Sequence, residues 1–141
     1  MGHIFFIAPS SPGSLEKLSQ WTLRWLLERD LAIDSTMYTC NSIEDATSLL
    51  ESALNFGQSP TLIIFDHSDR PTEKNIAFSK ALRDGIPESW IIEFVPDNMP
   101  AQQDDDNLFW VRRPLTEDEW DETLDLVLLK SGSPQWAKVE T

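Results

Sequence analysis

At 141 residues, the chain is long enough to bury one real hydrophobic core and too short to form two domains. Hydrophobic residues make up 40% of the sequence and charged residues 25%, a balance that excludes an intrinsically disordered chain. The 24 acidic residues outnumber the 11 basic ones and give a net charge of −13, which argues against direct nucleic-acid binding because phosphates would be repelled.

Nothing in the sequence indicates a membrane segment, a disulfide or a metal centre. No apolar run approaches the roughly 20 residues of a membrane span, and the start Met1–Ala8 is too short and uncharged for a signal peptide. We therefore expect a cytoplasmic protein. The single Cys40 cannot form an internal disulfide, and His3 and His67 show no metal-ligand spacing, so we expect no metal and no cofactor.

The chain begins with a strand followed by a helix. The apolar run Ile4–Ala8, which Pro9 ends, is typical of a central strand covered on both faces. A helix capped by Ser14 follows and extends to about Asp30. Its inward positions recur at helical spacing: Leu15, Leu18, Trp21, Thr22, Trp25 and Leu26.

A second strand and helix follow in the same order. Ile33–Cys40 alternates β-forming residues, Asn41–Ser42 opens the helix, and Gly57 ends it. The apolar stripe of this helix consists of Ile43, Ala46, Leu49, Leu50, Ala53 and Leu54.

The third strand, Thr61–Phe65, is the most apolar, and it places Asp66 at its carboxyl end. A polar loop follows, in which we expect His67 to be a surface residue. The third helix is predicted over Glu73–Asp84 and stops at Gly85. We expect its inner side to carry Ile76, Ala77, Lys80 and Ala81.

The last third of the chain predicts two strands and one helix. The predicted strands are Trp90–Val95 and Leu108–Val111. The stretch Asp97–Asn107 between them has low helix propensity, so we expect a fourth helix to be weak or missing there. Thr116 and Glu119 form a capping box for the final helix. Its buried stripe is Trp120, Leu124, Val127 and Leu128. The domain therefore covers residues 1–132, and residues 133–141 are a tail or linker.

Five strands alternating with helices predict a parallel sheet with helices on both faces, an α/β three-layer sandwich. The flavodoxin-like strand order 2-1-3-4-5 is the common solution at this size. The carboxyl ends of its strands meet at one edge, where ligands bind. The candidate site residues at that edge are Ser10, Ser11, Asp66, Asp69, Asp97 and Arg113.

The element order and the segment Leu62–Asp66 resemble the receiver domain of two-component response regulators, over about Ile4–Lys130. In that family an Asp at the end of the third strand accepts a phosphoryl group, and Asp66 is the matching position. The family also ends its fifth strand with Lys-Pro, whose ammonium contacts the phosphoryl oxygens. Arg113 stands at that place, so the resemblance implies a phosphate contact or an ion pair with Asp66.

Two departures from the family pattern point away from ordinary receiver chemistry. The acidic pair that holds Mg²⁺ after the first strand is replaced by Ala8, Pro9 and Ser10. The Thr or Ser that ends the fourth strand is replaced by Val95. The chain therefore resembles a degenerate member, a pseudo-receiver, which is not an enzyme and acts in bacterial signalling through protein contacts.

The expected partner is another signalling protein or an attached output domain. Docking is expected on the face near the fourth strand, Asp97–Asn107 and the last helix, and a homodimer through that face is a second expectation. Two other functions stay open. One is flavin or small-molecule binding by the hydroxyl-rich turn Ser10–Ser14, and the other is a phosphorylatable response regulator that uses Asp66.

Overall fold

The computed structural model describes residues 2–9, 12–33, 35–67, 72–86, 88–95, 108–111 and 116–131, except the side chains of 12, 14, 130 and 131. These residues form five strands and four helices. In chain order the elements are β1 (Gly2–Ile7), α1 (Pro12–Glu28), β2 (Ser35–Cys40), α2 (Ile43–Asn55), β3 (Leu62–Asp66), α3 (Glu73–Gly85), β4 (Trp90–Phe94), β5 (Leu108–Val111) and α4 (Glu117–Ser131).

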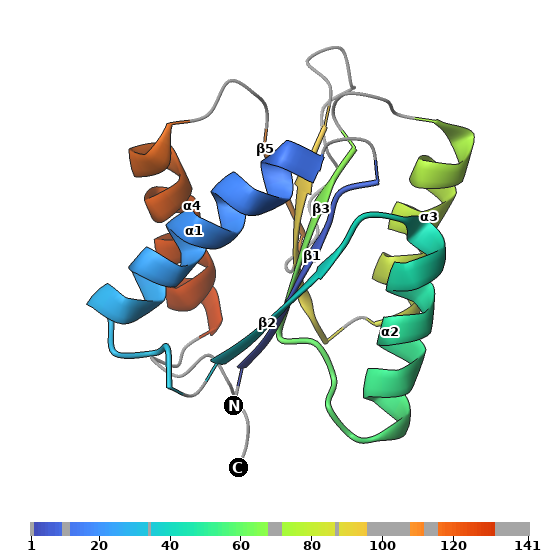
Figure 1. Ribbon diagram of the computed structural model, residues 1–141, viewed down its shortest axis with the longest axis horizontal. Helices are drawn as coiled ribbons and strands as arrows, with labels where there is room; N and C mark the ends of the chain where they lie inside the picture. Colours follow the sequence, from blue (N-terminus) through green and yellow to red (C-terminus); the bar gives the residue numbers. More distant parts are fainter. Residues whose placement is uncertain are drawn as a thin grey trace.

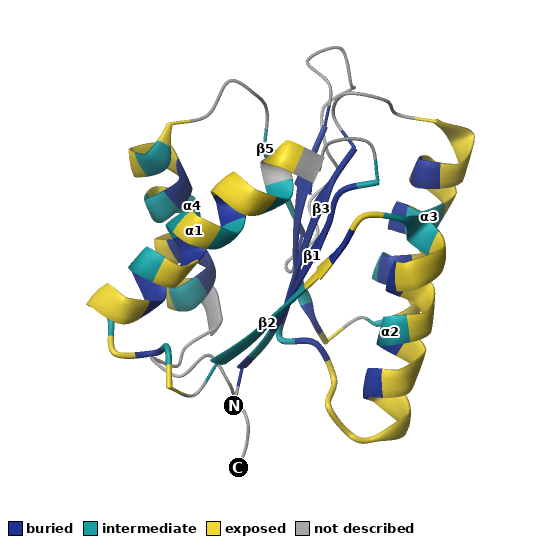
Figure 2. Ribbon diagram, in the orientation of Figure 1, coloured by how far each residue is buried: buried dark blue, intermediate teal, exposed yellow. Residues whose placement is uncertain are grey.

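The strands form one parallel sheet in the order β2-β1-β3-β4-β5, as the sequence predicts. Helices α1 and α4 cover one face of this sheet, and α2 and α3 cover the other (Figure 1). Every residue of β3 is buried, because β3 lies between two strands and under helices on both faces (Figure 2). The predicted α/β, flavodoxin-like three-layer architecture is therefore confirmed.

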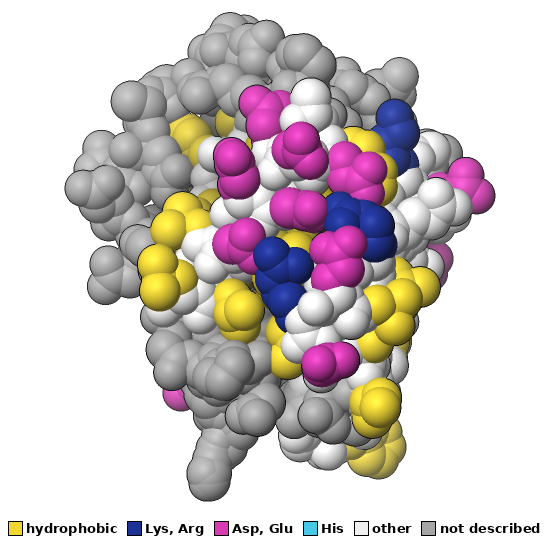
Figure 3. Space-filling view, turned by 90° about the vertical axis from the view of Figure 1, so that its left-hand side faces the viewer, with side chains coloured by type: hydrophobic (Ala, Val, Ile, Leu, Met, Phe, Trp, Pro, Cys, Tyr) yellow, Lys and Arg dark blue, Asp and Glu magenta, His cyan; other side chains and the backbone are white. Residues whose placement is uncertain are grey.

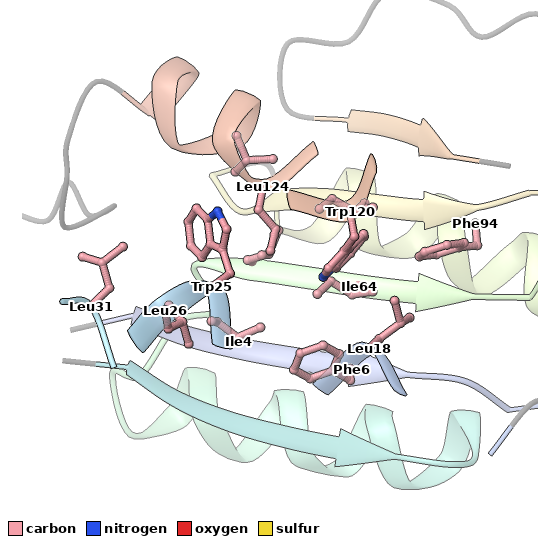
Figure 4. Close-up of a cluster of buried hydrophobic side chains, with 13 residues drawn as sticks. Ile4, Phe6, Leu18, Trp25, Leu26, Leu31, Ile64, Phe94, Trp120 and Leu124 are labelled. Atoms are coloured by element: carbon pink, nitrogen blue, oxygen red, sulfur yellow. The ribbon is translucent and has the colours of Figure 1, made fainter. Parts of the chain in front are cut away.

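The core divides into two layers, one on each face of the sheet. On the α1/α4 face, Trp25 and Trp120 are fully buried and pack with side chains of the inner strands (Figure 4). On the other face, small and branched side chains of α2 fill the space above β1 and β3, with Leu82 from α3 beside them. The predicted inward stripes of the first, second and last helices therefore carry the core, apart from Leu54, which is 43% exposed.

Three helices begin at side-chain caps. Ser42 accepts a hydrogen bond from the Asp45 amide at 3.1 Å, and Thr72 accepts one from the Asn75 amide at 3.1 Å. Thr116 and Glu119 form the predicted capping box, since the Glu119 amide donates to Thr116 Oγ1 and the Thr116 amide donates to Glu119 Oε1. At the end of α2, Gly57 adopts φ +71°, a left-handed conformation that side chains disfavour.

Helices α1 and α4 are joined by polar contacts as well as by the core. Arg24 Nη2 donates to the two carboxylate oxygens of Asp121, at 2.8 and 2.7 Å, and Arg24 Nε donates to Glu117. The Trp120 indole donates to the Thr22 hydroxyl at 3.0 Å, inside the buried layer. These contacts fix the two helices side by side.

Two predictions about helices are wrong. Helix α1 begins at Pro12, so Ser14 lies within the first turn and is not the cap, because proline fits the first position of a helix. The inner side of α3 is formed by Asn75, Ser79 and Leu82. The residues expected there are exposed: Ile76, Ala77, Lys80 and Ala81. Burial of Leu82, with Phe78 and Ile86 packed partly against the core, fixes the helix rotation and carries Asn75 and Ser79 inward.

The second strand is shorter than predicted, beginning at Ser35, and Ile33 before it is 92% exposed. The prediction of a weak or missing helix falls on residues 97–107, which lie outside the described residues, as does the predicted tail 133–141. In the described part of the chain, every helix is too short or too polar to span a bilayer.

Candidate functional site

The carboxyl edge of the sheet is the candidate site, and Asp66 lies where the sequence predicts, at the end of β3. Its neighbour in β4 is Phe94. Side chains alternate along a strand, so Asp66 shares the α1/α4 face with Ile64, and His67 shares the α2/α3 face with Phe65. Asp66 is 1% exposed, so its carboxylate is closed to solvent.

Two apolar residues follow the strands that flank β3, at positions where receiver domains carry polar groups. Ala8 follows β1 and is 0% exposed, and Val95 follows β4 and is 1% exposed. Their amides continue the sheet, with Ala8 N–H donating to Cys40 O at 3.1 Å and Val95 N–H donating to Val111 O at 3.0 Å. Both positions therefore carry hydrocarbon side chains, which provide neither a metal ligand nor a hydroxyl.

The other predicted site residues are not placed. Ser10, Ser11, Asp69, Asp97 and Arg113 lie outside the described residues, so their convergence with Asp66 stays a prediction. The same holds for an ion pair between Asp66 and Arg113, and for flavin binding by the turn that contains Ser10 and Ser11. Within the described ranges, no three His, Cys, Asp or Glu side chains are grouped closely enough to hold a metal ion.

A buried polar network lies beside Asp66, on the opposite face of the sheet. The His67 Nε2–H donates to Glu93 Oε2 at 2.5 Å, and the Trp110 Nε1–H donates to Glu93 Oε1 at 3.1 Å. His67 is 0% exposed and Glu93 is 3% exposed. The network therefore joins the end of β3 to β4 and β5.

Each member of this network has a physical role. A carboxylate buried without partners costs several kcal/mol, and here both of its oxygens accept hydrogen bonds. The His67 ring stacks on Phe65, with 4.6 Å between the ring centroids and an angle of 13° between the planes. The hydrogen bond to Glu93 occupies Nε2 of the imidazole, and Nδ1 has no partner among the described residues. The network therefore orients one imidazole directly after Asp66.

This network was not predicted from the sequence. The prediction of His67 as a surface residue is wrong, because the strand-end geometry turns its ring toward the α3 side of the sheet. A signal was present at Glu93, which interrupts the apolar strand Trp90–Phe94. A carboxylate inside a fully covered strand requires a buried donor, and His67 was the nearest candidate at the neighbouring strand end.

Cys40 ends β2 next to the Ala8 amide and is buried, as expected for an apolar thiol. Burial raises the pKa of this thiol, with the nearby Asp45 carboxylate adding to the effect. The cysteine therefore stays protonated at neutral pH.

Comparisons with known proteins support the fold. No family model and no curated protein matches the chain. Among solved structures, a response regulator receiver domain protein from Bacillus halodurans C-125 is similar, with a TM-score of 0.58, 13% identity, and coverage of 89% of this chain and 95% of that one.

A second solved structure, described as a lipoprotein fragment from Peptoclostridium difficile 630, has a TM-score of 0.51 and 10% identity. The match covers 92% of this chain and 98% of that one. At identities of 10% and 13%, both likenesses concern the fold alone. The chain has the receiver-like α/β fold.

Proposed function

We propose that this chain is an atypical receiver domain that works by binding another protein in bacterial signalling, without Mg²⁺-dependent phosphorylation of Asp66. It acts as a binding module and not as an enzyme. A cytoplasmic location is part of the proposal and rests on the resemblance to receiver domains.

One observation carries the proposal: Asp66 is buried, and the strands on either side of it end in apolar side chains where phosphoryl transfer needs ligands. Asp66 is 1% exposed, and Ala8 after β1 and Val95 after β4 are buried apolar residues. Phosphoryl transfer depends on Mg²⁺ to neutralise the phosphoryl oxygens, and Mg²⁺ requires oxygen ligands. The fold is kept while two groups that serve that reaction are replaced by hydrocarbon.

The proposed docking face includes the last helix, α4, together with the edge of the sheet near β4 and residues 97–107. Two leucines of α4 support this choice, because Leu126 is 43% and Leu129 is 76% exposed. Phe109 and Val111 of β5, at the sheet edge, are only half-buried. Exposed apolar side chains of this kind mark binding surfaces when they gather on one element.

Incubation with acetyl phosphate and Mg²⁺ tests the proposal directly. Intact-mass spectrometry is expected to show no phosphorylated species, because Asp66 lacks an accessible metal-assisted pocket. Asp84→Asn, which changes an exposed carboxylate of α3, is the matched control for Asp66→Asn. Stoichiometric, hydroxylamine-sensitive labelling that is lost in Asp66→Asn and kept in Asp84→Asn would refute the proposal.

A further inference from the structure

The side of α4 that faces away from the core carries an ordered stripe of four exposed side chains: Asp118, Glu122, Leu126 and Leu129. Their spacing of four, four and three residues places them on one face of the helix. We name this set the outer stripe. Its first half is acidic and its second half is apolar.

The two carboxylates of the outer stripe differ from the other acidic groups of α4. Arg24 binds Glu117 and Asp121, and Arg29 binds Asp125 at 2.6 Å. Glu119 is used by the capping box. Asp118 and Glu122 are exposed, and neither makes an ion pair or hydrogen bond to another described side chain.

The leucines of the outer stripe, Leu126 and Leu129, lie outside both layers of the core. Leu124 and Val127 on the inner side of α4 are 0% exposed, whereas Leu129 is 76% exposed. The space-filling view of this side shows acidic side chains gathered around basic ones over α1 and α4, with hydrophobic side chains at the margin (Figure 3). An apolar surface that adjoins unneutralised carboxylates suits a partner with both kinds of group.

We infer that the outer stripe docks a basic amphipathic helix of the partner protein, and this inference rests on the proposed binding function. A helix presents apolar and basic side chains in successive turns along one face, which matches the order of groups on the outer stripe. Its Lys or Arg groups pair with Asp118 and Glu122, and its apolar groups cover Leu126 and Leu129. The net charge of −13 accelerates the encounter with a basic partner.

A second copy of the chain fits the outer stripe less well. A two-fold interface brings the same surface of both copies together, so acidic groups would face either acidic groups or leucines. The first arrangement adds like-charge repulsion between two chains of net charge −13, and the second buries unpaired carboxylates. A basic partner avoids both costs.

Binding of a synthetic helix tests this inference on the intact chain. The probe is a fluorescein-labelled Leu/Lys/Ala peptide of about 15 residues, close to the length of α4, with Leu and Lys on one helical face. One control peptide has Glu in place of Lys, and a second has the same composition in shuffled order. Fluorescence anisotropy gives the affinity, and amide shifts of ¹⁵N-labelled protein locate the site.

Matched variants separate the outer stripe from general electrostatics. Leu129→Ser is expected to weaken probe binding about fivefold or more, whereas Leu27→Ser, at a 59% exposed leucine of α1, leaves it unchanged. Glu122→Gln is expected to weaken binding and to reduce its salt dependence. Glu51→Gln, at an exposed carboxylate of α2, serves as its control.

The inference is overturned if the shuffled peptide binds as tightly, if the amide shifts centre on α2 or α3, or if Leu27→Ser and Leu129→Ser weaken binding equally. Concentration-dependent dimers that Leu129→Ser abolishes, without probe binding, would assign the stripe to a second copy and also overturn it. The proposed binding function fails by a separate result, the phosphorylation of Asp66, so the two failures are distinguishable.

Discussion

Glu93 is the residue on which the buried network depends, because its two oxygens accept both hydrogen bonds. In Glu93→Ala, the His67 and Trp110 donors lose their acceptor inside the protein. We expect a loss of about 3 kcal/mol in the free energy of unfolding, the usual cost of breaking a buried charged network. Urea denaturation measures this loss.

Glu51→Ala on exposed α2 is the control for Glu93→Ala and is expected to change stability little. ¹⁵N spectra of the histidine side chains give an independent readout. The imidazole signals of His67 should shift in Glu93→Gln, while those of His3, which contacts Tyr38, stay in place. Unchanged His67 signals would contradict the hydrogen bond to Glu93.

Cys40 permits a second prediction at the scale of one residue. Because burial raises the pKa of its thiol, native protein should react slowly with a disulfide reagent at mildly alkaline pH. Unfolding in concentrated guanidinium chloride should make the reaction fast.

The same shift has a consequence for stability. As pH rises, the unfolded chain loses the thiol proton first, so the free energy of unfolding should fall above the ordinary pKa of cysteine. Cys40→Ser should remove this pH dependence. Fast reaction of the native protein would contradict the buried position.

At the scale of the element, the capping box of α4 has a measurable contribution. Thr116→Ala removes the acceptor for the Glu119 amide and should cost about 1 kcal/mol of stability. The control is Thr47→Ala in α2, where the hydroxyl donates to Ile43 O within the helix and no cap is lost. Equal urea midpoints for the two variants would show that the box is not formed.

The elements themselves follow closely from local sequence, and their exceptions have physical causes. β3 and the last helix were predictable because an apolar run and a capping box are local signals. The rotation of α3 about its axis was not predictable, because its apolar residues do not form one stripe. The packing of Leu82 determines which side of this helix faces the core. Local pattern is informative only where it agrees with tertiary packing.

The candidate site was only half predictable for a related reason. Asp66 was found because a polar residue at the end of an apolar strand is visible in sequence. The hydrogen bonds of the buried network join Glu93 to His67, 26 positions away, and to Trp110, 17 positions away. No local spacing in the sequence reveals such contacts. It becomes evident only once the strands are placed next to one another.

At the scale of the whole molecule, the charge imbalance sets the response to salt. A net charge of −13 produces self-repulsion that is stronger in the compact state than in the expanded unfolded chain. Added NaCl should therefore raise the urea midpoint, even though it weakens the ion pairs of Arg24 and Arg29. The slope of the transition should stay constant, and a lower midpoint in salt would show that the ion pairs dominate.

The contacts between α1 and α4 also determine when the molecule can become complete during synthesis. The Trp120 indole hydrogen-bonds to Thr22, which lies 98 positions earlier in the chain, and the Trp25 indole hydrogen-bonds to Asp125, which lies 100 positions later. A growing chain therefore holds all five strands and the first three helices before the α1/α4 side of the sheet is covered. Until the final helix leaves the ribosome, the apolar layer around Trp25 stays exposed. During this interval a chaperone or another incompletely folded chain can bind it.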